Sequence, residues 1–283
     1  MQFSGGFSLS GGISLAVPTA PAPGPTSLFN GITNYTYTNN SYTASAGSNY
    51  SSAYSVDGTK LYLNSSGDIK QYTLSTPFNI STASDSGKTF SIAGTSAYGI
   101  DFSTDGGNLY LSSRAYGSIR QYTLSTPWDI STASYTTQSL NTTIVTGSFV
   151  LQDLSVATDG SAIFFAVQDG TKLVYKLSLS TPWNASTGTI SASSLSIAAQ
   201  TGAGPIALAV TKDGGNVLVT AVTRTVLQYS LSSPWNLGTS SYVGSKSLSE
   251  GGDFYSLYFG NSDTQLISSG SSGATSYQYS NGL

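Results

Sequence analysis

The sequence predicts an all-β protein: a five-bladed β-propeller of four-stranded antiparallel blades, closed by an N-terminal strand and preceded by an extended arm. Two repeated motifs carry this prediction. The segment QYTLSTPFNISTAS, which begins at Gln71, returns almost unchanged at Gln121, and looser copies occupy 175–187 and 228–240. An Asp-Gly pair followed by an apolar triplet keeps the same interval, beginning at Asp57, Asp105, Asp159 and Asp213. Self-similarity at a period of about 50 residues indicates a repeat architecture.

Each repeat reads as four short strands. Asp-Gly between two alternating apolar runs is a strong hairpin signal, because both central residues of that turn adopt positive φ. In the second repeat this hairpin joins Gly99–Ser103 to Asn108–Ser112, and a third strand follows at Ser118–Ser125. A loop of the STPW type then leads to a fourth, more polar strand, such as Lys88–Ala93 in the first repeat. Four antiparallel strands in about 50 residues are typical of a propeller blade.

The last repeat is incomplete, and this predicts how the ring closes. Its strands at Tyr255–Phe259, Gln265–Ser268 and Ser276–Ser280 are not followed by a fourth. Near the other end of the chain, the alternating segment Thr33–Asn39 belongs to no repeat. We therefore expect Thr33–Asn39 to pair with Ser276–Ser280. This pairing would remove the two exposed edges that an open array of blades leaves.

The chain before the ring divides into two further segments, so we expect an extended docking arm (1–16), a proline-rich linker (17–29) and the propeller (30–283). The arm lacks the basic start and the continuous apolar core of a secretory signal, and it cannot span a membrane. Its apolar residues alternate with Ser and Gly, as in a strand that lies against a partner; they are Phe3, Phe7, Leu9, Ile13 and Leu15. A flexible tail is the alternative interpretation.

Composition excludes several classes of function. Charged residues make up 8% of the 283 residues and the net charge is −3, which gives no electrostatic basis for gripping nucleic acid or an anionic membrane. With no Cys, neither disulfides nor thiolate metal sites can form, and with no His the commonest metal ligand and general base is missing. We therefore expect no cofactor, no metal site and no catalytic residue. A calcium ion held by carboxylates and carbonyls in the channel stays an open alternative.

Most acidic residues have a structural explanation, because Asp is favoured in tight turns for backbone reasons alone. Asp153 and Asp253 differ, since they stand near the starts of innermost strands and can face the channel. Glycoside cleavage would need two carboxyl groups several ångströms apart, one of them with a raised pKa. Nothing in the spacing of the acidic residues demands such a pair.

The aromatic residues fall into repeated and non-repeated sets. A residue that recurs once per blade is most simply a packing element; these are Phe78, Trp128, Trp183 and Trp235, with a second set in the third strand at Tyr72, Tyr122, Tyr175 and Tyr229. Non-repeated residues carry more functional information, because the scaffold does not require them. Tyrosines combined with arginines in hairpin loops are typical of adaptable recognition surfaces. The candidate ligand face consists of Tyr98, Arg114, Tyr116, Asp153, Arg224, Asp253 and Tyr255.

Two segments carry a resemblance to known families. The segment IDFSTDGGNLY, at Ile100–Tyr110, resembles the blade repeat of lactonase-like and quinoprotein-type propellers. Joined to QYTLSTPWDISTAS, it is similar to propeller repeats in structural proteins of tailed bacteriophages. The resemblance covers about residues 33–283 and implies the propeller fold. The enzymatic relatives use polar and acidic channel residues around a metal, and no set of positions here matches such a site. The arm and linker resemble the anchoring segment of a virion accessory protein.

These observations lead to the hypothesis of a phage virion structural protein, a fibre, collar or capsid-surface module rather than an enzyme. Its arm would bind other virion proteins, and its propeller would contact a host-surface glycan or protein. We expect it at the particle surface, in multiple copies within a symmetric assembly, without nucleic-acid binding or membrane insertion. Two alternatives stay open: a propeller hydrolase acting on sugars or lactones, and a secreted bacterial adhesion module.

Overall fold

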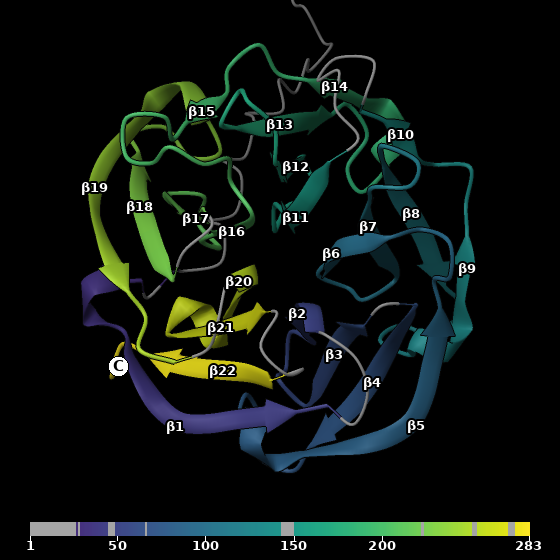
Figure 1. The fold of residues 1–283 in the computed structure, drawn as a ribbon. Helices are drawn as coiled ribbons and strands as arrows, with labels where there is room; N and C mark the ends of the chain where they lie inside the picture. The colour runs from purple at the N-terminus through teal and green to yellow at the C-terminus, as the bar shows by residue number, and fades with distance from the viewer. Residues whose placement is uncertain are drawn as a thin grey trace, which may run out of the picture.

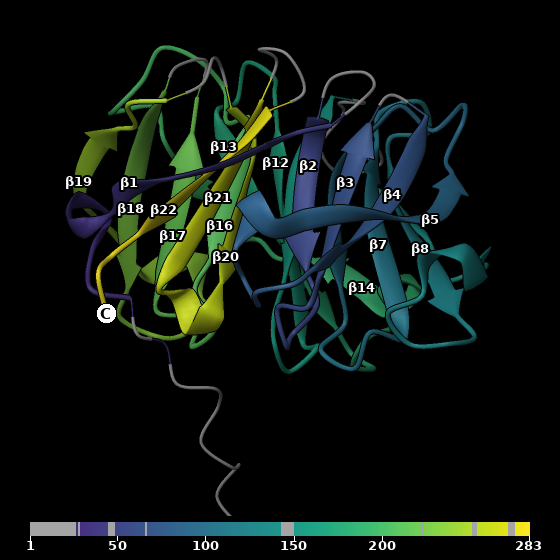
Figure 2. The same ribbon diagram turned by 90° about the horizontal axis from the view of Figure 1, so that it is seen from below.

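The computed structural model describes residues 27, 29–44, 49–65, 67–142, 150–221, 224–250, 254–270 and 275–283. Within these ranges the chain forms five antiparallel sheets arranged radially around an axis, as Figure 1 shows face-on and Figure 2 from the side. The helices in these ranges are short 3-10 helices, and none is long and apolar enough to cross a membrane. The predicted fold class, a five-bladed β-propeller, is confirmed. The docking-arm residues Phe3, Phe7, Leu9, Ile13 and Leu15 lie outside the described residues.

Each blade places its first strand at the axis and its last strand at the rim (Figure 1). Blade 1 consists of β2 (Asn49–Tyr54), β3 (Lys60–Ser65), β4 (Asp68–Leu74) and β5 (Ala83–Ser91). Blade 2 consists of β6 (Ala97–Phe102), β7 (Asn108–Ser113), β8 (Ser118–Leu124), β9 (Ala133–Tyr135) and β10 (Leu140–Asn141). Blade 3 consists of β11 (Leu151–Val156), β12 (Ala162–Val167), β13 (Leu173–Leu179), β14 (Gly188–Ile190) and β15 (Leu195–Ser196). Blade 4 consists of β16 (Ala207–Val210), β17 (Asn216–Thr220), β18 (Thr225–Leu231) and β19 (Ser240–Ser247).

Blade 5 closes the ring with strands from both ends of the chain. It consists of β20 (Phe254–Gly260), β21 (Gln265–Gly270), β22 (Thr275–Ser280) and β1 (Thr36–Thr43). β1 pairs antiparallel with β22, with Thr36 opposite Ser280, so the predicted closure is confirmed. The predicted bounds were wrong by a few residues, because Ile32–Asn34 forms a 3-10 helix, η1, and the strand begins after it.

The fourth strands differ from the prediction in two ways. β5 begins at Ala83 rather than Lys88, because the 3-10 helix η2 (Ile80–Thr82) delivers the chain directly to the sheet edge. In blades 2 and 3 the fourth strand is interrupted. β9 pairs with β8 at residues 122–124 and β10 pairs with it at residues 118–119, so Arg120 and Gln121 lie opposite the gap.

The four repeated aromatic residues cover the Asp-Gly turn of their own blade. Trp128 has a φ of 62°, and its backbone N donates a hydrogen bond to the carbonyl O of Gly106 at 3.1 Å. A Cβ atom on Gly106 would lie 2.3 Å from the indole ring. The turn position therefore needs glycine for space as well as for its φ of 73°. The same pairing occurs in three other blades, as Gly58–Phe78, Gly160–Trp183 and Gly214–Trp235.

A glutamine in the third strand joins four of the five blades to the next blade. Gln121 Oε1 accepts a hydrogen bond from the backbone N of Ala185 at 2.9 Å, at the start of the 3-10 helix η4 (Ala185–Thr187) in blade 3. Gln121 Nε2 also donates to the carbonyl O of Trp183 at 2.9 Å. The same Oε1 bond recurs at three other junctions, as Gln71–Ile130, Gln228–Ile32 and Gln278–Ile80. Four of the five junctions therefore carry the same clamp.

The junction from blade 3 to blade 4 lacks this clamp. Lys176 occupies the equivalent position in blade 3: it pairs with Phe164, as Gln121 pairs with Tyr110 in blade 2. Burial lowers the pKa of Lys176. The register also corrects the predicted third-strand tyrosine set, because Leu177 rather than Tyr175 occupies that position in blade 3. The expected match failed because blade 3 shares only part of the repeated motif.

The clamp gives a paired stability prediction. We expect Gln121→Leu to lower the free energy of unfolding by about 1–3 kcal/mol, because the buried backbone N of Ala185 loses its acceptor and the carbonyl O of Trp183 keeps only the bond from Tyr110 Oη. We expect Lys176→Gln to raise the free energy of unfolding by about 1 kcal/mol, because it supplies the missing bond to η5 (Leu237–Thr239). Urea unfolding of both variants and the parent measures the two effects. Equal stability of all three proteins would show that the clamp is dispensable.

Candidate functional site

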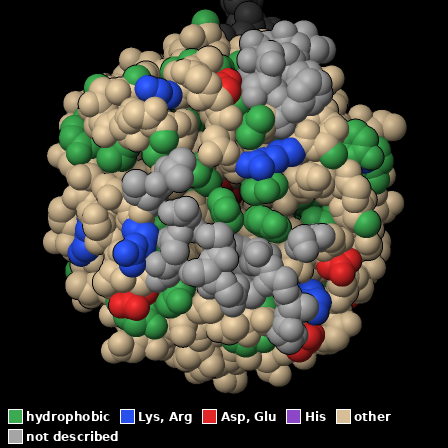
Figure 3. All heavy atoms as spheres, viewed as in Figure 1, with side chains coloured by type: hydrophobic (Ala, Val, Ile, Leu, Met, Phe, Trp, Pro, Cys, Tyr) green, Lys and Arg blue, Asp and Glu red, His purple; other side chains and the backbone are tan. Residues whose placement is uncertain are grey.

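The innermost strands bring three tyrosines together at one mouth of the channel. Tyr50, Tyr98 and Tyr255 form a mutual cluster, with ring centroids 4.7, 5.7 and 6.0 Å apart. Their strands β2, β6 and β20 share an irregularity at this level, because the pairing register shifts at residues 49–51, 97–100 and 254–256. Such bulges re-aim side chains. In Figure 3, side chains of the class that includes tyrosine gather around the centre of this face, with a basic group beside them.

Arg114 completes the cluster. Its guanidinium carbon lies 3.5 Å from the centroid of the Tyr98 ring, within cation–π range. Nε donates to the carbonyl O of Leu151 at 3.2 Å, and one terminal nitrogen donates to Gln168 Oε1 at 3.4 Å. Burial lowers the pKa of Arg114. Among the described residues the structure shows one ion pair, between Lys88 and Asp129. No described carboxylate therefore forms an ion pair with Arg114.

Two glutamines extend the polar side of this mouth. Gln152, in β11, occupies the bulge of blade 3, where the register shifts between Leu151 and Leu154. Gln152 Nε2 donates to Gln168 Oε1, which also accepts from Arg114. Gln152 is fully buried, and its Oε1 has no hydrogen-bond partner among the described residues. This oxygen is therefore an unsatisfied acceptor inside the wall of the mouth and is closed off from solvent.

A cavity of about 180 Å³ opens beside the tyrosines. Tyr50 and Tyr98 form one wall, and the rest is lined by the turn from Ile92 to Ala97 and by Gly67. Pockets for drug-sized ligands measure about 300–1,000 Å³, so this cavity suits a single ring or the end of a larger molecule.

Below the tyrosines the channel is closed by Asp153. Its Oδ2 accepts hydrogen bonds from the backbone N of Leu208 and of Leu257, both at 3.1 Å, and thereby joins blades 3, 4 and 5. Asp153 is 1% exposed, and burial holds its pKa well above the ordinary value. The backbone of blade 2 packs closely against the strand that carries Asp153, since a Cβ atom on Gly99 would lie 2.7 Å from the backbone N of Leu154. Asp153 lies in the channel but does not belong to an open ligand face.

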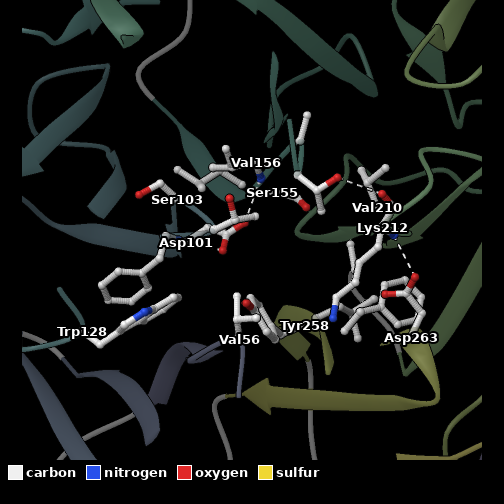
Figure 4. A pocket seen from close by; sticks show the side chains of 18 residues that line it. Val56, Asp101, Ser103, Trp128, Ser155, Val156, Val210, Lys212, Tyr258 and Asp263 are labelled. Carbon is white, nitrogen blue, oxygen red and sulfur yellow. Dashed lines mark hydrogen bonds between the residues drawn. The ribbon is translucent and has the colours of Figure 1, made fainter. Parts of the chain in front are cut away.

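The opposite mouth holds a second, smaller cavity of about 80 Å³, shown in Figure 4. Asp101 and Tyr258 lie between its two sides, with Trp128 on one side and Lys212 and Asp263 on the other (Figure 4). The two oxygens of Asp101 accept hydrogen bonds from the backbone N of Phe102 and of Val156, both at 2.8 Å. Burial raises the pKa of Asp101 to about 7. Burial therefore favours the protonated form of this carboxyl, while the two backbone N–H groups favour the charged form.

The other residues of the predicted ligand face lie apart from the tyrosine cluster. Tyr116 belongs to the same hairpin as Arg114 but contacts Arg120 on the outer part of blade 2. Arg224 belongs to the corresponding hairpin of blade 4, where it donates to the carbonyl O of Ser249 at 3.3 Å. Asp253 lies outside the described residues. Within the described chain, His, Cys, Asp and Glu form no group of three that could hold a metal ion.

Tyr50 is the member of the cluster that the sequence did not single out. Tyr50 and Tyr98 both stand seven residues before the Asp of their Asp-Gly turn. Aligning the repeats on this turn, rather than searching for non-repeated residues, would have placed Tyr50 beside Tyr98.

Comparison with known proteins shows the fold. No family model and no curated protein matches the chain. A functionally unknown protein from Desulfotomaculum acetoxidans is 18% identical, with a TM-score of 0.51 over 80% of this chain and 66% of that one. Two Bacteroides structures are each named a "putative 6-phosphogluconolactonase". The B. fragilis protein is 14% identical, with a TM-score of 0.48 over 70% of this chain and 54% of that one. The B. uniformis protein is 13% identical, with a TM-score of 0.46 over 75% of this chain and 61% of that one.

These comparisons correct the expectation that the protein is not an enzyme. Structures with similar propellers carry the name of an enzyme, so the fold gives no ground for excluding catalysis. At 13–18% identity the likeness establishes the fold alone. The chain spans between 54% and 66% of the length of these three structures. The chain is a five-bladed β-propeller, similar in structure to the functionally unknown protein from Desulfotomaculum acetoxidans.

The raised pKa of Asp101 predicts a pH-dependent stability. Between the unfolded pKa of about 4 and the folded pKa of about 7, the folded protein binds more protons at this carboxyl than the unfolded chain does. The free energy of unfolding should therefore fall as the pH rises through this window, and Asp101→Asn should flatten the slope by up to about 1.4 kcal/mol per pH unit. Urea unfolding at several pH values measures the slope. Asp159→Asn, in an exposed turn, is the control, and identical slopes for both variants would contradict the assignment.

Proposed function

We propose that the protein is a recognition module that binds a sugar ring at the mouth lined by Tyr50, Tyr98 and Tyr255. The observation that carries the proposal is the tyrosine cluster itself, which lies where the pairing register of β2, β6 and β20 shifts. Aromatic faces offer apolar contact to the C–H face of a sugar, and adjacent polar groups fix its orientation. Arg114 supplies such a group, because it is a half-buried cation without a described carboxylate partner.

The proposal is tested by binding to an array of bacterial cell-surface glycans, followed by calorimetric titration with the strongest ligand. We expect Arg114→Gln and Tyr255→Ala each to weaken binding by about tenfold or more, because each removes a contact to the ligand. Arg224→Gln, in the corresponding hairpin of blade 4, is the matched control and should bind as the parent does. Equal affinity of all three variants would place the ligand elsewhere.

The second part of the proposal concerns the setting of this module. We propose that the arm mounts the propeller on a larger assembly, and that this assembly is a bacteriophage particle. The alternating apolar residues of the arm can pair with a partner's sheet edge and fill its pockets. The ring supports this division of labour, because its closing strand β1 begins at Thr36, after the linker.

Deleting residues 1–26 tests the mounting. We expect the truncated protein to stay soluble and to melt cooperatively, because every described strand is retained. We expect it to be missing from assembled particles that incorporate the full chain. Incorporation of the truncated protein at the normal level would assign the docking surface to the propeller instead.

A hydrolase acting on a lactone or a glycoside is the second candidate function. It is favoured by Asp101, a carboxyl with a pKa of about 7 at the centre of the smaller cavity. A protonated carboxyl can donate its proton to the ring oxygen that leaves as water adds to a lactone carbonyl. This activity would be established if the parent protein hydrolyses a lactone and Asp101→Asn does not. Arg114→Gln and Tyr255→Ala, at the tyrosine mouth, should hydrolyse the lactone as the parent does.

A further inference from the structure

The outer part of blade 2 carries an arginine stacked between two exposed tyrosines. The guanidinium carbon of Arg120 lies 4.4 Å from the Tyr116 ring centroid and 4.2 Å from the Tyr135 ring centroid. Tyr116 is 53% exposed and Tyr135 is 49% exposed. A planar guanidinium held by two ring faces keeps its edges free for hydrogen bonds in its own plane.

The interruption of the fourth strand creates the space in front of this stack. β9 ends at Tyr135 and β10 begins at Leu140, so Arg120 lies opposite the gap between them. In blade 1 the fourth strand is continuous, and Lys70, the counterpart of Arg120, is paired with Thr89. The gap opens into a cavity of about 330 Å³, whose polar lining includes Ser118 and Ser139.

Arg120 has no described partner for its charge. Its Nε is buried and has no hydrogen-bond partner among the described residues. The one ion pair among those residues joins Lys88 to Asp129, so no described carboxylate pairs with Arg120. The cavity lining contains no carboxylate. Because Nε is buried, a ligand in the cavity would reach the terminal nitrogens of the partly exposed guanidinium, where an anionic acceptor gains a charge-assisted bond.

We propose that this cavity is a second binding site, specific for a sugar that carries a carboxylate, such as a uronic acid. The planar carboxylate matches the edge of the Arg120 guanidinium, which can donate two parallel hydrogen bonds to it. The exposed parts of Tyr116 and Tyr135 offer apolar contact to the sugar ring, and Ser118 and Ser139 line the same cavity. The site is separate from the tyrosine mouth and stands whether or not that mouth binds a sugar.

The test is calorimetric titration of the full chain with trigalacturonate and with its methyl ester, which keeps the rings but removes the charge. We expect the parent protein to bind the acid and to bind the ester about tenfold or more weakly. Arg120→Gln should reduce acid binding by a similar factor. Lys70→Gln removes a cation from the same strand position in blade 1 and should leave binding unchanged.

Two further variants keep the outcome decisive. Tyr116→Ala, at an exposed position, should weaken binding without changing the melting temperature, and it serves if Arg120→Gln fails to fold. Arg114→Gln should bind trigalacturonate as the parent does, because Arg114 belongs to the other site. The proposal is overturned if the parent does not bind trigalacturonate, or if Arg120→Gln and Tyr116→Ala bind it normally. It is also overturned if an acidic peptide binds at Arg120 and the uronate does not.

Discussion

The unpaired inner edges of the five axial strands are the constraint on which this structure depends. Each innermost strand pairs with its blade on one side only, so its other edge presents backbone groups to the axis. Asp153 accepts hydrogen bonds from β16 and β20, Asp101 accepts one from β11, and Ser51 accepts one from β6. These side chains close the ring from the inside and the glutamine clamps close it from the outside. The waist of the channel is therefore occupied by the scaffold, and the space for ligands lies at its mouths and on the blades.

The sequence was sufficient for the fold because four of the five blades repeat the same turn chemistry. Asp-Gly turns and STPW loops fix where strands begin and end, and the missing fourth strand of blade 5 specified how the ring closes. The glutamine of the repeated QY pair was visible, but its role was not, because its partner lies in the next blade. The interrupted fourth strands of blades 2 and 3 were missed for a similar reason, since Ser- and Thr-rich segments read alike whether they pair or not.

The candidate site was predictable only in part. Tyr98, Tyr255 and Arg114 do meet at one mouth, but the choice of non-repeated residues missed Tyr50. Whether a side chain at the end of an inner strand faces the axis depends on the bulges in these strands. Such bulges leave no signal in a single sequence. Tyr116 and Arg114 therefore looked equivalent, although the hairpin that carries both directs them to different surfaces.

The use of acidic residues in the scaffold explains why two arginines of blade 2 contact tyrosine rings rather than carboxylates. The carboxylates of the Asp-Gly turns accept local hydrogen bonds, as Asp105 does from Ser103 Oγ at 2.6 Å and from the N of Gly107 at 2.9 Å. Asp101 and Asp153 are bound to backbone N–H groups at the axis. Few carboxylates are left over in a chain with 13 acidic residues, so Arg114 and Arg120 stack on tyrosines instead. A tyrosine ring holds a guanidinium in place without accepting the hydrogen bonds that its edge can donate. An Asp or Glu partner would have occupied those donors, so the choice of tyrosine is what makes both proposed sites chemically feasible.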